Sequence, residues 1–186
     1  MPSGLAALGV PLSGRITDGA APGRAIGRLT DLGWGARLRR LLAEPDGDVP
    51  DDVVAAAIEV LKAWDWDCRP VAVMGLDSRT HPKLISSTVQ RLAQIGRLTD
   101  LGVLRYTPQS RPVTAANSAY RVAALDGAWE RPQWGVADEG TGGHWQGPVL
   151  LIDDMTDTGW TLTMAARLLR DAGAPGVLPF VFATVS

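Results

Sequence analysis

Residues 149–161 read VLLIDDMTDTGWT, and this stretch decides the fold expected for the chain. Its first residues belong to an apolar run, residues 148–153, that is typical of a buried strand. Two adjacent acids, Asp153 and Asp154, follow the apolar residues, and a hydroxyl-rich loop with one glycine comes next. Residues 161–172 then have the pattern of a helix, which stops before Gly173. This order predicts an α/β protein, because such proteins bind ligands where their strands end.

The loop has the composition of a phosphate site. Backbone N–H groups and the dipole at a helix start attract phosphate, hydroxyls add donors, and glycine lets the backbone approach closely. The candidate phosphate-binding residues on this ground are Thr156, Thr158, Gly159 and Thr161. Carboxylates in front of a phosphate repel it unless they face another group, and ribose hydroxyls are suitable partners. We therefore expect Asp153 and Asp154 to bind ribose; the alternative interpretation is a helix cap with solvated acids.

The rest of the chain alternates strand-like and helix-like segments. This alternation predicts a mostly parallel sheet flanked by helices. The expected strands are residues 70–76, 101–106, 119–125, 148–153 and 176–185; the expected helices are 25–42 (one or two short helices), 50–64, 82–95 and 161–172. We divide the chain into a flexible tail or linker (residues 1–23), an N-terminal helical extension (24–69) and the main domain (70–186).

Composition excludes several classes of protein. The 186 residues carry a net charge of −2 and a single cysteine, which excludes an internal disulfide framework and a multi-thiolate zinc site. A cytoplasmic location is the default, and no run of apolar residues is long enough to span a membrane. The sequence contains neither a P-loop nor a dinucleotide fingerprint. Arg37, Arg39 and Arg40 form the only basic cluster, so we expect no DNA contact by this chain alone.

With these residues in view, the sequence VLLIDDMTDTGWT resembles the phosphoribosyl pyrophosphate motif of type I phosphoribosyltransferases. The resemblance implies that Asp153 and Asp154 bind ribose hydroxyls and that residues 157–161 bind the 5-phosphate. It thereby adds Asp157 and Trp160 to the phosphate-binding loop, although Trp160 stands where the family has a small residue or lysine. By the same resemblance Asp157 is a candidate general base at the acceptor.

Two more segments acquire a role from this resemblance. Residues 70–82 match the place of the pyrophosphate loop, with Ser78 and Arg79 as candidate pyrophosphate-binding residues. Residues 107–119 match the flexible loop that closes over the site, where Arg111 is either a pyrophosphate ligand or a solvated charge. The family uses Mg²⁺ together with phosphoribosyl pyrophosphate; no metal ligand is assigned directly to a side chain of this chain.

A longer resemblance narrows the family. Residues 116–122 resemble the ComF-like subgroup, and residues 23–42 and 50–54 resemble the C-terminal phosphoribosyltransferase-like region of certain bacterial RecQ-type DNA helicases. The first functional hypothesis is a Mg²⁺-dependent transfer of phosphoribosyl to a nitrogenous base. The second is a non-catalytic phosphoribosyl or nucleotide sensor, fused to or partnering a RecQ-type helicase in DNA repair. The acceptor base and the oligomeric state stay open, with a homodimer as one option.

Overall fold

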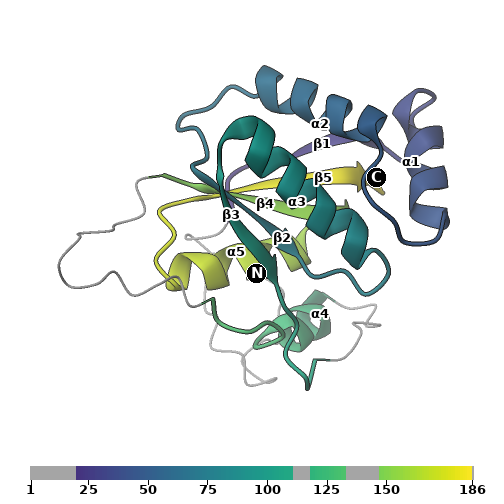
Figure 1. Ribbon diagram of the computed structural model, residues 1–186. Helices are drawn as coiled ribbons and strands as arrows, with labels where there is room; N and C mark the ends of the chain where they lie inside the picture. Colours follow the sequence, from purple (N-terminus) through teal and green to yellow (C-terminus); the bar gives the residue numbers. More distant parts are fainter. Residues whose placement is uncertain (1–19, 111–117, 133–146, 186) are drawn as a thin grey trace.

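The computed structural model describes residues 20–110, 118–132 and 147–185. They form one parallel sheet with the strand order β1-β5-β4-β2-β3, flanked by helices (Figure 1). The strands are β1 (Arg24–Arg28), β2 (Ala72–Leu76), β3 (Thr99–Leu104), β4 (Val149–Thr156) and β5 (Val177–Thr184). The predicted α/β class with a parallel sheet is confirmed. Within the described residues, no helix has both the length and the hydropathy that a membrane crossing requires.

Helices cover both faces of the sheet and divide the core into two layers. Helices α1 (Trp34–Ala43), α2 (Asp51–Ala63) and α3 (Pro82–Gly96) lie on one face, and α4 (Ser118–Leu125) and α5 (Trp160–Asp171) lie on the other (Figure 1). Successive residues of a strand point to opposite faces. Leu150 and Ile152 accordingly pack under α1–α3, whereas Val149 and Leu151 pack under α4 and α5. The same alternation decides where the two acids of β4 point.

The central strands are apolar on both faces because both faces are covered. All five residues of β2 are buried, as are the first five of β4, which explains why both strands are apolar along their length up to Asp153. The edge strands β1 and β3 are only partly buried. The apolar pattern of the sequence is therefore clearest in the central strands, one of which, β4, carries the two acids.

Gly75 in β2 is expected to tolerate no side chain. A Cβ there would lie 2.4 Å from Cγ2 of Ile85 and 3.1 Å from Cγ2 of Val89, both on α3 and buried. We expect Gly75→Ala to lower the free energy of unfolding by about 1–3 kcal/mol, since α3 must move away from the sheet. Gly33→Ala is the matched control, because a Cβ at that position would have no neighbouring atom within 4 Å. Equal denaturant midpoints for the two variants would contradict this packing.

One predicted element near the N-terminus differs from the structure. Residues 24–28, expected to begin a helical segment, form the edge strand β1, which pairs with β5. Gly27 and Gly35 let β1 and the start of α1 approach closely, since a Cβ on Gly35 would lie 2.7 Å from two backbone oxygens of the β1–α1 turn. Residues 24–69 also share the core under α1–α3 with Phe180 and Phe182 of β5. This segment is thus built into the sheet and its cover; of the predicted tail, only residues 20–23 are described.

Two other elements differ in type or length. Residues 118–125, predicted as a strand from 119 onwards, form helix α4, which buries Val122 and Leu125 at helical spacing. Strand β4 runs three residues further than predicted, because Met155 and Thr156 still pair with β5. The two acids therefore lie within a strand and not beyond its end.

Candidate functional site

The two acids of β4 point to opposite faces of the sheet. Asp153 shares its strand face with Val149 and Leu151, and Asp154 shares its face with Leu150 and Ile152. Asp153 is therefore directed towards the layer of α4 and α5, and Asp154 towards the layer of α1–α3. The two carboxylates leave the strand on opposite faces, yet they still interact, because Asp154 raises the pKa of Asp153.

Asp154 is held by the loop that follows β2. Ser78 Oγ donates a hydrogen bond to Asp154 Oδ2 over 2.8 Å, and His81 Nδ1 lies 3.3 Å from the same oxygen. The Ser78 hydroxyl also accepts the N–H of His81 at 2.9 Å, which closes the loop onto the start of α3. The resemblance implied that Ser78 binds pyrophosphate. In the structure its hydroxyl instead donates to Asp154, a candidate ribose-binding acid.

Asp153 is buried near the carboxyl end of β4, the central strand of the sheet. Its residue is 7% exposed, and its Oδ1 accepts the backbone N–H of Asp154 at 2.9 Å. Burial, followed by the charge of Asp154, raises the pKa of Asp153 to about 8. Burial also raises the pKa of Tyr106, and the nearby charge of Asp153 adds to that rise. At neutral pH Asp153 therefore carries a proton, so the acid pair holds fewer negative charges than its sequence suggests.

The loop after β4 has the backbone of an anion site. Gly159 adopts a φ of +74°, which glycine tolerates and other residues rarely adopt, and α5 begins at the next residue. The N-cap residue Gly159 has no side chain that could cap α5, so among the described residues the first N–H groups of the helix are left for a ligand or solvent. Asp157 and Thr158 are exposed in this loop, while Trp160 packs against the core beneath α5. Trp160 therefore takes part in packing, and its bulk lies on the core.

Arg121 is a site residue that sequence reasoning missed. It projects from α4, and its Nη1 lies 3.4 Å from Thr158 Oγ1 and 3.6 Å from Asp157 Oδ2. The guanidinium thus brings positive charge to a loop that otherwise carries acids. The erroneous strand prediction for residues 119–125 concealed it, because Arg121 reaches the loop from a helix.

Arg79, the second candidate pyrophosphate residue, points to a different neighbour. Its guanidinium lies 4.3 Å from the centroid of the Tyr106 ring, and its Nη2 donates to both the backbone oxygen and the hydroxyl of Ser110. In this conformation Arg79 contacts the segment that follows β3. It is directed to Tyr106 and Ser110 and not to a pyrophosphate position beside Ser78. Arg111, the flexible-loop candidate, lies outside the described residues.

The described residues do not form a metal site by themselves. They contain no group of three or more His, Cys, Asp or Glu side chains arranged to hold an ion. Mg²⁺ is commonly bound by one or two carboxylates together with substrate phosphates. Any Mg²⁺ at this site would therefore depend on oxygens of its ligand, and we assign no metal-binding role to a particular side chain.

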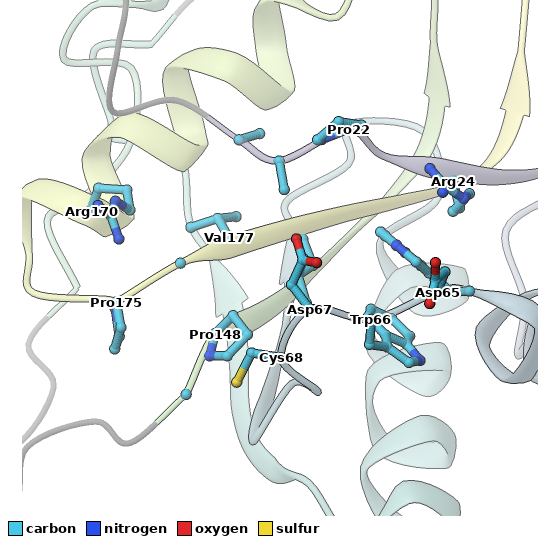
Figure 2. A pocket seen from close by; sticks show the side chains of 16 residues that line it. Pro22, Arg24, Asp65, Trp66, Asp67, Cys68, Pro148, Arg170, Pro175 and Val177 are labelled. Carbon is cyan, nitrogen blue, oxygen red and sulfur yellow. The ribbon is translucent and has the colours of Figure 1, made fainter.

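Two hollows beside the described part of the sheet are not lined by the acids. A hollow of about 330 Å³ touches the loop at Thr156 and Gly159 and extends along β1 and β5, but neither acid lines it. A larger hollow of about 700 Å³, which we call the amino-end hollow, lies at the amino ends of the strands (Figure 2). Because parallel sheets bind ligands at the carboxyl ends of their strands, we base the site on the loop and not on the larger hollow.

The aromatic residues beside the amino-end hollow are packed together. Trp64 is 6% exposed, its ring stacks on that of Trp66 at 4.2 Å, and the guanidinium of Arg24 lies 5.1 Å from its centroid. Trp66 and Arg24 thus both contact the Trp64 ring, so this ring is engaged in packing.

Comparisons with protein-family models, curated proteins and solved structures found no match for this chain. Its function is therefore inferred from the geometry of the site.

Proposed function

We propose that this protein binds a ribose 5-phosphate group, as part of phosphoribosyl pyrophosphate or a nucleotide. The observation that carries the proposal is the order of groups along the end of β4 and the loop that follows it. A carboxylate oriented by Ser78 is followed, within a few residues, by a positive-φ glycine and an uncapped helix start. The carboxylate suits a sugar hydroxyl, and the helix start suits a phosphate. One short segment thereby matches both ends of the same ligand.

The charges of the site fit this ligand. A phosphate dianion near Asp154 and Asp157 is repelled unless positive charge compensates them. Arg121 lies against Asp157, and the proton on Asp153 removes one negative charge at neutral pH. The dipole of α5 contributes a further partial positive charge at Trp160. These three contributions make phosphate binding at an acidic loop electrostatically reasonable.

Phosphoribosyl transfer is the reaction that such a site would support. The bond from the anomeric carbon to the diphosphate breaks, a bond to a nitrogen of the acceptor base forms, and the nitrogen loses its proton. Positive charge develops on the ribose in the transition state, and a carboxylate beside it is stabilising. Asp157 is the candidate acceptor for the proton, which requires its pairing with Arg121 to loosen. Arg79 would have to leave Tyr106 to reach the diphosphate.

Calorimetry with ribose 5-phosphate and with phosphoribosyl pyrophosphate plus Mg²⁺ tests the proposal. We expect saturable binding of both, and no saturable heat for either at millimolar concentration would contradict it. A panel of nitrogenous bases then separates two functions. Release of pyrophosphate with one base supports a transferase. Binding without release supports the alternative, a cytoplasmic sensor that works with a RecQ-type helicase.

Arg121→Gln is expected to weaken the binding of ribose 5-phosphate about tenfold, because a charge-assisted bond to the phosphate is lost. The variant should also show a smaller loss of affinity than the wild type when ionic strength rises. Arg131→Gln is the matched control, since Arg131 lies on the same side of the sheet and donates to the backbone oxygen of Asp171. Unchanged affinity and salt dependence for Arg121→Gln would remove Arg121 from the site.

A further inference from the structure

His81 is a buried histidine whose backbone and side chain serve different purposes. It immediately precedes α3, which starts at Pro82, and the residue is only 9% exposed. Its backbone N–H donates to Ser78 Oγ, and its backbone oxygen accepts the N–H of Ile85 at 3.1 Å. These backbone contacts start the helix with any side chain at position 81. The imidazole is therefore not needed to form α3.

The imidazole contacts the same carboxylate oxygen that Ser78 contacts. His81 Nδ1 lies 3.3 Å from Asp154 Oδ2 and 2.9 Å from the hydroxyl of Thr80. The terminal torsion of an aspartate is broad, so a single hydrogen bond leaves the carboxylate free to turn. Two groups on Oδ2 restrict that rotation. Within the described part of the chain, both of these side-chain contacts use Oδ2 and neither uses Oδ1.

We propose that His81 is a positioning residue that orients Asp154 towards a sugar hydroxyl. This inference rests on the proposed function, because it assigns the ribose end of that ligand to Asp154. A preorganised acceptor gains affinity when its supporting contacts hold it in the bound orientation. The proposal requires a proton on Nδ1, since a bare Nδ1 would face the carboxylate with a lone pair. It also predicts that His81 acts only through Asp154.

A double-mutant cycle followed by calorimetry tests this dependence. His81→Leu is expected to weaken ribose 5-phosphate binding about tenfold and to leave the affinity for inorganic phosphate unchanged. His81→Asn keeps a side-chain N–H near the position of Nδ1 and should retain most of the affinity. In the Asp154→Asn background, His81→Leu should have no further effect. An equal loss in both backgrounds, or no loss in the wild-type background, would overturn the positioning role.

Two measurements separate this role from a structural one. Thr88→Val is the matched control, because Thr88 is fully buried on the same helix and its hydroxyl donates to the backbone oxygen of Leu84. It should lower the melting temperature without changing the affinity for ribose 5-phosphate. Nitrogen NMR of the wild-type protein should show a protonated Nδ1 on His81, and the signal is easily assigned because the chain has two histidines. A bare Nδ1 would overturn the proposal even if the His81→Leu variant does not fold.

The outcomes also distinguish this inference from the proposed function. If the wild-type protein binds no ribose 5-phosphate, the proposed function is wrong and the inference fails with it. If the wild type binds and His81→Leu binds equally well, the proposed function stands and only the inference fails. If His81→Leu loses affinity for inorganic phosphate as strongly as for ribose 5-phosphate, the imidazole supports the whole loop and the positioning role is contradicted.

Discussion

Replacing Asp153 and Asp154 together by asparagine is expected to weaken the binding of ribose 5-phosphate about 100-fold. The loss comes mainly from Asp154, whose carboxylate is partly accessible and is oriented by Ser78. A charge-assisted hydrogen bond contributes about 1.5–3 kcal/mol, and a neutral amide retains only part of this. Asp153 is buried and protonated at neutral pH, so its replacement should add little to the loss. The single variants measured by calorimetry should rank in that order.

The matched control is the double variant Asp65→Asn with Asp67→Asn. These two acids are exposed and line the amino-end hollow, at the other end of the strands from the candidate site (Figure 2). Their replacement makes the same two Asp→Asn changes without touching β4. We expect this variant to bind ribose 5-phosphate like the wild type. Loss of binding in the control, with full binding in the β4 double variant, would move the site to the amino-end hollow.

The centre of the fold was predictable because burial on both faces leaves a strong pattern. Strands β2, β4 and β5 are apolar runs bounded by proline, glycine or acids, and α5 follows β4 with clear helical spacing. In each case local propensity and tertiary burial favour the same structure. The segment that decides the fold is therefore also the segment whose prediction needed the smallest correction.

The errors lie where local pattern and tertiary context disagree. Strand β1 has five residues, arginine at both ends and only intermediate burial, so its pairing with β5 leaves almost no apolar signal. Helix α4 contains Tyr120 and Val122, which favour strands in isolation. Its helical character comes from alanines and from the burial of Val122 and Leu125 on the side of α5. Edge pairing and helix docking are both long-range effects that a local window does not report.

The candidate site was predictable in its residue types but not in its geometry. The sequence placed acids before a phosphate-type loop, yet the length of β4 determines which face each acid occupies. The supporting residues were also hidden, because Ser78 and His81 are more than 70 positions from Asp154 in the chain. Arg121 is 37 positions from Thr158. These contacts form only because the fold brings the carboxyl ends of β2 and β4 together with residues from both helix layers.

The stability of the protein is expected to fall as the pH rises from about 4 to about 8, in part because of Asp153. An aspartate in an unfolded chain has a pKa near 3.9, whereas burial raises that of Asp153 to about 8 in the fold. Between these values the folded state binds the extra proton, so each rise in pH favours the unfolded state. The contribution is fully favourable below the lower value. It is lost as the pH passes through the upper value, with a limiting slope of about 1.4 kcal/mol per pH unit.

Asp153→Asn should remove this pH dependence, because the amide keeps an N–H donor where the protonated acid has its O–H and has no charge to bury. We expect the variant and the wild type to be similarly stable near pH 4 and the variant to be more stable at pH 9, by an amount on the order of a few kcal/mol. Denaturant unfolding at several pH values measures the difference, which cancels contributions from titrating groups that do not interact with Asp153. Asp65→Asn, at an exposed position, should show no such trend.

A constant difference between Asp153→Asn and the wild type across this range would mean that the Asp153 carboxyl is ionised in the fold. The acid pair would then need a bound cation or a further donor to be stable. Such a result would also withdraw one of the three charge contributions that favour phosphate binding at this loop, and it would leave Arg121 and the start of α5 to balance the acids.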